Sequence, residues 1–349
     1  MSLESKKRMI KMKNMRKEIW IAIVLIGILI IAGGFYYWDS QSKDSMNETP
    51  VKIAINQWSG YAYAFIAEEK GFFEKNNVKV ELVFDKEYFP SQKKYKNGEV
   101  DGIFEVFSDT IFHNSEGIKT KIVYIIDYSN EGDVIVGKSS LNSLADLKGK
   151  KVGVDGINSF SHLFVLSDLE KAGVKEGEVQ FENVPAQQVL DALEQGKIDA
   201  GHTWEPIKSA ALAKGYKQLG KAGDILGILT DVLAFNDKII EERPEDIQAI
   251  VKSMLEAKEF LDKNPEEAIK IMAEKEEMTE EEIKSEINGI HQLNLNENIE
   301  AMKKSEEITS LYVSGAIITD FYIKRGQLSS MPDFESIIEP RFVNNVGKK

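Results

Sequence analysis

The apolar and polar positions divide the chain into an N-terminal apolar block, a long alternating region and a tail with helical spacing. The block, residues 19–38, contains no charged side chain. Because about 20 residues at a helical rise of roughly 1.5 Å span a hydrocarbon core of about 30 Å, the block predicts one transmembrane anchor. A cleaved secretory signal is the alternative, but the run is long for a signal, and bulky aromatic residues follow it.

The segments that flank this block predict its orientation. The basic side chains ahead of it are Lys6, Lys7, Arg8, Lys11, Lys13, Arg16 and Lys17. They favour a cytoplasmic position for residues 1–18, while the aromatic residues 35–38 are typical of the outer membrane interface. We therefore expect a single-pass protein of the cell membrane. Residues 39–50 form a polar linker, and everything beyond them lies outside the cytoplasm.

Beyond residue 50, strand-like and helix-like stretches alternate. The apolar runs that predict strands are 51–55, 78–84, 102–106, 122–126, 134–137, 151–155, 179–184 and 198–202. Segments 161–172 and 186–195 between them have apolar residues at helical spacing. Such alternation predicts an α/β fold, with parallel-rich sheets covered by helices on both faces.

The C-terminal tail predicts helices, and each has a recognisable start. Pro244 and Pro265 stand at first helical positions and are followed by acids, with Asn264 as an N-cap. Thr279 and Glu282 have the spacing of a capping box. The acidic composition of these helices indicates solvated outer faces.

One short pattern occurs twice. Residues 97–102 (NGEVDG) resemble residues 195–200 (QGKIDA), and in both a glycine suited to a left-handed helix end precedes an aliphatic residue and an aspartate. We interpret Asp101 and Asp199 as structural. The repeat predicts two similar α/β lobes, and ligands bind such sheets at the carboxyl ends of their strands. Two lobes that face each other would clamp a ligand.

The composition limits the function classes. The net charge is −13 although the N-terminal segment is basic, so the region after the block is strongly acidic, which argues against nucleic acid as a partner. With no cysteine, disulfides, thiolate metal sites and lipid attachment through cysteine are excluded. The four histidines have no metal-ligand spacing, so we expect neither a metal nor a cofactor.

Several segments together resemble a known family. They are 56–61 (NQWSGY), 67–73 (AEEKGFF), 127–133 (DYSNEGD), 144–154 (LADLKGKKVGV) and 203–206 (TWEP). In this order and spacing they resemble the substrate-binding proteins of ABC importers of the nitrate, taurine and aliphatic-sulfonate type. That fold is shared with thiamine-pyrimidine synthases and binding proteins.

The resemblance implies a bilobal periplasmic-binding-protein fold of the type II kind. Lobe 1 would comprise residues 51–133 and 233–349, lobe 2 residues 134–229, and two crossovers would form the hinge. Such proteins capture a small polar solute, here a sulfonate, taurine, nitrate or a related compound, by closing their lobes. The partners implied are an ABC permease and its ATPase, and no catalysis is implied.

Two other functions stay open on the sequence alone. The predicted anchor departs from the family pattern, so the domain could belong to a membrane-tethered ligand sensor. A pyrimidine-synthase-like enzyme shares the fold, but the cysteine cluster of that branch is absent. The chain also has no phosphate-binding loop and no nucleophile elbow.

The candidate aromatic ligand contacts are Trp58 and Trp204, each of which follows a predicted strand in one lobe. Indole rings on opposing walls suit a flat ring or an ammonium group. The neighbouring Tyr61 could add a hydroxyl. The alternative for all three is packing in the core.

A second candidate set could hold an anion. Ser159, Ser161 and His162 stand where a strand leads into a helix, so their hydroxyls and the free N–H groups of the helix could bind sulfonate, carboxylate or nitrate oxygens. Ser59, next to Trp58, is a further candidate ligand contact. The alternative is an ordinary serine N-cap.

Carboxylates near the predicted strand ends and crossovers form the third set. They are Asp109, Asp127, Asp133, Glu205 and Asp231. Several acids together favour a cation or an amine. Glu205 could instead stabilise a helix N-terminus, and Asp127 and Asp133 could brace the hinge. Combined with a serine-lined anion seat, these acids suggest a zwitterion such as an aminosulfonate.

Overall fold

The computed structural model describes residues 49–225 and 227–347. Within these ranges no helix has both the length and the apolar character needed to cross a membrane. The predicted anchor, residues 19–38, and the cytoplasmic segment, residues 1–18, lie outside the described residues, as does most of the linker.

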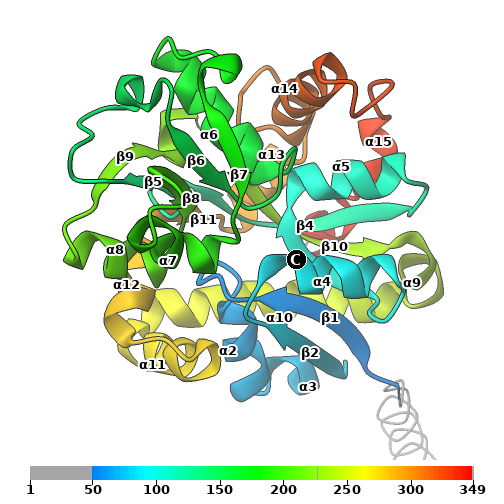
Figure 1. Cartoon of the computed structure of the whole chain (residues 1–349). Helices are drawn as coiled ribbons and strands as arrows, with labels where there is room; N and C mark the ends of the chain where they lie inside the picture. Colours follow the sequence, from blue (N-terminus) through cyan, green and yellow to red (C-terminus); the bar gives the residue numbers. More distant parts are fainter. Residues whose placement is uncertain (1–48, 226, 348–349) are drawn as a thin grey trace, which may run out of the picture. The chain divides into compact units, whose positions relative to one another are not determined.

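Two sheets organise the described chain (Figure 1). The first has the order β11-β4-β10-β3-β1-β2, and the second has the order β7-β6-β8-β5-β9. The strands of the first sheet are β1 (Val51–Asn56), β2 (Val80–Asp85), β3 (Gly102–Val106), β4 (Thr120–Ser129), β10 (Thr230–Asn236) and β11 (Ile290–Gln292). Those of the second are β5 (Val134–Gly137), β6 (Lys151–Val154), β7 (Gln180–Asn183), β8 (Ala200–Thr203) and β9 (Lys217–Lys221). We call each sheet with its helices a lobe, lobe 1 and lobe 2.

Helices flank both sheets. Between the strands of lobe 1 lie α2 (Tyr63–Glu69), α3 (Phe72–Lys75), α4 (Tyr88–Lys96) and α5 (Phe107–Ser115). Those of lobe 2 are α6 (Phe160–Lys171), α7 (Val189–Glu194) and α8 (Ile207–Ala213), with short 3-10 turns η1 (Leu144–Leu147), η2 (Glu176–Glu178), η3 (Ala186–Gln188) and η4 (Ala222–Ile225). The tail forms α9 (Asp237–Glu242), α10 (Pro244–Lys263), α11 (Pro265–Glu276), α12 (Glu280–Asn288), α13 (Leu295–Ala301), α14 (Leu311–Lys324), α15 (Phe334–Ile337) and α16 (Arg341–Val346).

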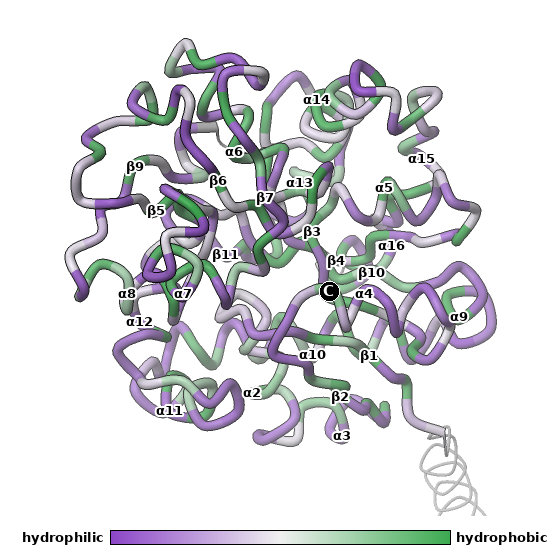
Figure 2. The backbone as a smooth tube through the Cα atoms, in the orientation of Figure 1, coloured by the Kyte–Doolittle hydropathy of each residue, from purple (hydrophilic) through white to green (hydrophobic). Residues whose placement is uncertain are grey.

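Burial explains how the tail attaches to lobe 1. Helix α10 buries Ile247, Ile250, Val251 and Met254, which recur at helical spacing and form one apolar stripe. It packs with α11 against α2, while α14 packs on α5. In Figure 2 the hydrophilic colour dominates the outer helices α9 and α11, as expected for solvated faces.

The strand pairing gives each lobe a mixed sheet. In lobe 1, β1 pairs in parallel with β2 and β3, and β10 lies antiparallel between β3 and β4. In lobe 2, β6 pairs in parallel with β7 and β8, and β5 lies antiparallel between β8 and β9. The chain leaves the first sheet after β4 and returns to it at β10, so two segments connect the lobes.

The repeated sequence pattern has the same structural role in both lobes. Gly98 and Gly196 adopt φ of 70° and 67° at helix ends, the left-handed region that glycine tolerates. Asp101 Oδ2 accepts a hydrogen bond from the backbone N–H of Lys52 at 2.9 Å. Its counterpart Asp199 Oδ2 accepts one from Lys151 N–H at 3.0 Å. Each aspartate therefore ties its turn to the neighbouring parallel strand.

The structure confirms one expectation for the tail and departs from two others. The capping box of Thr279 and Glu282 is confirmed. Asn264 stands at an N-cap position, but its side chain makes no capping hydrogen bond. The interpretation of the acidic helices as solvated throughout is wrong for Glu276 and Glu286, both fully buried, because they bind the loop after β1.

Candidate ligand-binding site

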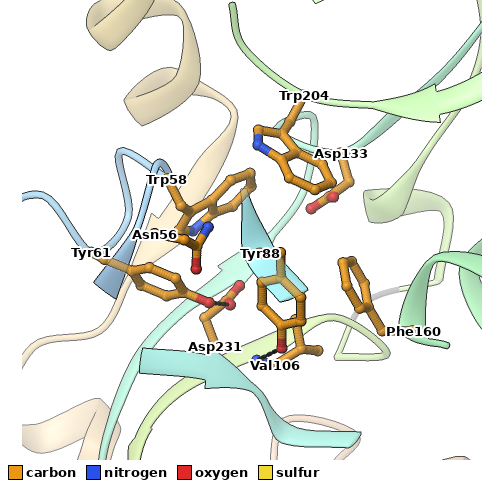
Figure 3. Close-up of a pocket in the computed structure, with 9 residues that line it drawn as sticks. All are labelled: Asn56, Trp58, Tyr61, Tyr88, Val106, Asp133, Phe160, Trp204 and Asp231. Atoms are coloured by element: carbon orange, nitrogen blue, oxygen red, sulfur yellow. Dashed lines mark hydrogen bonds between the residues drawn. The ribbon is translucent and has the colours of Figure 1, made fainter. Parts of the chain in front are cut away.

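A small cavity lies where the carboxyl ends of the lobe 1 strands face lobe 2. Its lining residues, drawn in Figure 3, are Asn56, Trp58, Tyr61, Tyr88, Val106, Asp133, Phe160, Trp204 and Asp231. Phe160 and Trp204 come from lobe 2, Asp133 from the connection between the lobes, and the others from lobe 1. This is the position expected for a ligand between two open α/β sheets.

Aromatic rings from both lobes form the walls. The rings of Trp58 and Trp204 meet edge to face, with centroids 6.3 Å apart at an interplanar angle of 86°. The ring centroids of Tyr88 in lobe 1 and Phe160 in lobe 2 are 5.0 Å apart. Aromatic pairs in this arrangement contribute about 0.5–1.5 kcal/mol beyond their burial. The two lobes are thus joined by the same rings that would enclose a ligand.

A pair of carboxyls lies at the lobe 1 end of the cavity. Asp127 of β4 and Asp231 of β10 are directly paired across the antiparallel strands. Trp58 Nε1 donates to Asp127 Oδ2 at 3.2 Å, and the Tyr61 hydroxyl donates to Asp231 Oδ1. Burial raises the pKa of Asp127 to about 7. Burial, followed by the charge of Asp127, raises the pKa of Asp231 well above its usual range.

The third carboxyl, Asp133, belongs to a chain of hydrogen bonds in lobe 2. His202 Nε2 lies 2.8 Å from Asp133 Oδ1, and His202 Nδ1 lies 2.7 Å from Ser161 Oγ. This serine, histidine and aspartate order is the one used in nucleophilic catalysis. Here Ser161 is fully buried, and its Oγ also accepts from the backbone N–H of Asp155 at 2.8 Å. The network therefore positions Asp133, and it does not present a nucleophile to the cavity.

Two buried glutamates position the loop that carries Trp58. Trp58 N–H donates to Glu276 Oε1 at 3.0 Å, and Ser59 N–H donates to Glu286 Oε2 at 2.9 Å. Burial raises the pKa of Glu276 to about 8 and that of Glu286 well above its usual range. These glutamates were not predicted, because nothing in an acid-rich helix separates a buried glutamate from its exposed neighbours.

The structure brings the predicted residues Trp58, Tyr61 and Trp204 to the cavity and places Asp127 directly behind Trp58. The predicted residues Ser59, Asp109, Ser159, Ser161, His162 and Glu205 are not among the residues that line it.

The predicted anion seat is used by the chain itself. Ser159 Oγ caps α6 by accepting from the backbone N–H of Ser161 at 3.1 Å, which is the ordinary N-cap alternative. His162 Nδ1 accepts from Asn158 N–H at 3.0 Å, and its ring packs 4.3 Å from that of Phe181. Ser159 also donates to the Asp155 carbonyl oxygen at 2.6 Å. The Ser159 hydroxyl and His162 Nδ1 are therefore already engaged within the protein, while His162 Nε2 is buried without a hydrogen-bond partner among the described residues.

The other predicted contacts support neighbouring residues. Asp109 accepts from the Tyr88 hydroxyl at 2.6 Å, and burial raises its pKa to about 6. Glu205 accepts from Ser209 N–H at 3.0 Å, as an acid at a helix N-terminus does, and from Ser285 Oγ of α12 at 2.8 Å. Asp109 therefore orients a ring of the cavity, and Glu205 joins lobe 2 to α12.

The sequence analysis did not single out four lining residues. Asn56 ends β1 within a segment that carried the family resemblance, and Val106 ends β3. Tyr88 and Phe160 begin α4 and α6. A position at a strand end or helix start was the available signal, but many residues share it.

Comparison with known proteins identifies a family and relatives of this chain. Residues 58–268 match the family described as NMT1/THI5 like. A protein of Brucella abortus, named as a binding protein, is 27% identical over 296 residues, which cover 81% of this chain and 88% of the relative. The taurine-binding periplasmic protein of Escherichia coli is 23% identical over 66% of this chain and 72% of its own length.

A solved structure shows the same fold. The alkanesulfonate-binding protein SsuA of Xanthomonas axonopodis pv. citri, bound to MOPS, aligns with a TM-score of 0.69 at 16% identity. The alignment covers 84% of this chain and all of SsuA. At this identity the likeness establishes the α/β periplasmic-binding-protein fold with its two sheets.

Proposed function

We propose, from the premise that this chain belongs to the NMT1/THI5-like family, that it is the extracytoplasmic solute receptor of an ABC importer. It captures a small polar solute between its lobes and delivers it to the permease and its ATPase. The single observation that carries the proposal is the cavity enclosed by Trp58 of lobe 1 and Trp204 of lobe 2. The taurine-binding and alkanesulfonate-binding relatives support the same role.

Capture would proceed by closure of the lobes, with residues 51–133 and 233–349 moving against residues 134–229. The first connection between the lobes supports this hinge. The backbone N–H groups of Asn130, Glu131 and Gly132 all donate to the Gly289 carbonyl oxygen, at 2.9, 2.6 and 2.9 Å. A Cβ on Gly289 would lie 2.7 Å from Gly132 N, so only glycine permits this close approach. Such a pivot holds one end of the connection on lobe 1.

The receptor would remain at the cell membrane through residues 19–38, the uncharged run of the N-terminal block. Its orientation follows from the basic residues ahead of that run. We propose no catalysis, because Ser161 is buried in its network and the chain has no cysteine.

Binding can be tested on the full-length chain in detergent. In a variant with Trp20→Phe and Trp38→Phe, fluorescence reports Trp58 and Trp204, since the chain has four tryptophans. The solutes are taurine, alkanesulfonates, nitrate, bicarbonate, thiamine pyrimidines, choline, small amides and a low-molecular-mass cell extract. We expect a saturable fluorescence change and a rise in Tm, because a ligand that binds the folded state stabilises it. No response to any solute or to the extract would contradict the proposal.

A further inference from the structure

Three residues of the cavity lining, Asn56, Asp133 and Asp231, carry acceptor oxygens. Asn56 is 1% exposed, and its Oδ1 has no hydrogen-bond partner in the protein, while its Nδ2 lies 3.4 Å from the Gln57 carbonyl oxygen. Figure 3 shows the Asn56 amide directed toward the space between the rings of Tyr61 and Tyr88. A buried acceptor without a donor is costly, so the cavity lacks a donor that a ligand would bring.

Several donors of the lining are already engaged with acids. Trp58 Nε1 donates to Asp127 at 3.2 Å, the Tyr61 hydroxyl to Asp231, and the Tyr88 hydroxyl to Asp109 at 2.6 Å. Among the described residues that line the cavity, none is a lysine or an arginine. A nitrate or sulfonate would therefore meet carboxyl groups and no lysine or arginine, so nothing in the lining would offset the cost of removing its hydration.

We infer that the solute carries a cationic N–H group, a primary or secondary ammonium or an amidinium. Asp133, Asp231 and Asn56 Oδ1 would accept its hydrogen bonds, and the rings of Trp58 and Trp204 would cover its apolar part. This inference rests on the proposed receptor function and narrows its solute.

A bare metal ion fits the site less well. Within the described part of the chain, no group of three or more histidine, cysteine, aspartate or glutamate side chains could hold a metal. The acids are also flanked by five aromatic residues, Trp58, Tyr61, Tyr88, Phe160 and Trp204. Aromatic faces beside carboxyls match an organic cation, whose charge and carbon atoms both find partners.

The decisive test compares solutes of equal length and opposite charge on the full-length chain. Propylammonium, methylammonium and guanidinium are titrated against propanesulfonate and nitrate at constant ionic strength, with Tm as the readout. We expect a saturable rise in Tm with at least one of the cations and none with the anions. A rise with propanesulfonate or nitrate and none with any cation overturns the cationic class but leaves the receptor function intact. A response to neither class, nor to the cell extract, defeats both.

Two variants connect the response to these carboxyls. Asp231→Asn and Asp133→Asn keep the shape of the side chain but cannot form a carboxylate opposite the cation, and each should weaken binding of the cation by about tenfold or more. The matched control is Asp168→Asn, which alters a buried lobe 2 aspartate that is not part of the lining. The Tm of each unliganded variant reports folding. Unchanged affinity in folded Asp231→Asn and Asp133→Asn would overturn the assignment.

Discussion

Asp127 and Asp231 lie opposite each other on β4 and β10, and both carboxyls are buried beneath the rings of the cavity. They are separated by more than a hundred positions in the sequence, and only the antiparallel register brings them together. Trp58 donates to one and Tyr61 to the other, so the pair fixes two of the three predicted aromatic contacts. The rings and the acids therefore form one site.

This pair makes stability depend on pH. Burial raises the pKa of Asp127 from 3.8 to about 7, so between these values the folded chain holds more protons than the unfolded chain. The stabilisation of the folded state by this bound proton is complete below about pH 3.8 and is lost as the pH rises through about 7. We expect Asp231→Asn, whose amide supplies a permanent donor to Asp127, to gain in Tm relative to the wild type between pH 5 and pH 8.

Thermal unfolding of both proteins at several pH values measures this difference. The groups that face the pair, Asp133 and Tyr61, are unchanged in the variant. If the Tm values of the wild type and of Asp231→Asn change in parallel from pH 5 to pH 8, the proton is not held by Asp127 and Asp231.

Gly60 is the position where an added methyl group should disrupt the site. A Cβ there would lie 2.0 Å from Asp127 Oδ2 and 2.3 Å from Trp58 Nε1, the two atoms of their hydrogen bond. We expect Gly60→Ala to lower Tm and to reduce solute affinity by about tenfold or more, as for a lost hydrogen bond to a charged group. Gly177→Ala is the control, because nothing lies within 4 Å of its Cβ position. Equal behaviour of the two variants would refute this role.

An ion pair at the C-terminal end of α14 joins the lobes. Arg325 Nη2 lies 2.7 Å from Glu176 Oε1 of η2 and 3.1 Å from Asn158 Oδ1, both in lobe 2. Such partly exposed pairs contribute about 0–1 kcal/mol. Because the pair exists only when the lobes are together, we expect Arg325→Ala to weaken solute binding by about two- to fivefold.

The control for this pair is Lys324→Ala. Lys324 contacts Asp320 of its own helix at 2.6 Å, so its removal should not affect closure. Titration calorimetry compares the two, and Glu176→Gln completes a double-mutant cycle with Arg325→Ala. Additive effects in the cycle would mean that the pair does not act as a unit.

Glu286 should stabilise the fold because its carboxyl accepts a hydrogen bond from the buried backbone N–H of Ser59. Glu286→Ala leaves the buried Ser59 N–H without its acceptor, at a cost of about 1–3 kcal/mol in the free energy of unfolding. Glu286→Gln keeps an acceptor and should cost less. Denaturant unfolding measures both, with the exposed Glu281→Ala of the same helix as a control expected within about 0.5 kcal/mol of the wild type. A loss in Glu281→Ala as large as in Glu286→Ala would count against this account.

The sequence correctly predicted the strands that have a strong apolar pattern. The run 102–106 is β3, and 134–137 is β5, since every residue in them is buried and apolar residues dominate. Strand β9 was not predicted, because KQLGK is mostly polar and lies at a sheet edge, and β11 has three residues. Strand β10 is apolar only in its centre. The sequence analysis placed a crossover between the lobes at its start and predicted no strand there.

The site was predictable in part for a similar reason. Tryptophan is rare in this chain, and Trp58 and Trp204 follow strands, so their position carried information. Serines at a helix start carry less, because capping explains them fully, as it does for Ser159. The pairing of Asp231 with Asp127 depends on a register between distant strands that no local pattern contains.

Native mass spectrometry of the full-length protein, purified gently from its own cells, tests the central claim most directly. The account predicts one small bound solute on the wild type and on Gly177→Ala. It also predicts loss of that solute from Trp204→Ala, because that variant removes the lobe 2 wall of the cavity. The same solute retained by folded Trp204→Ala at full occupancy would place the binding site elsewhere and contradict the account.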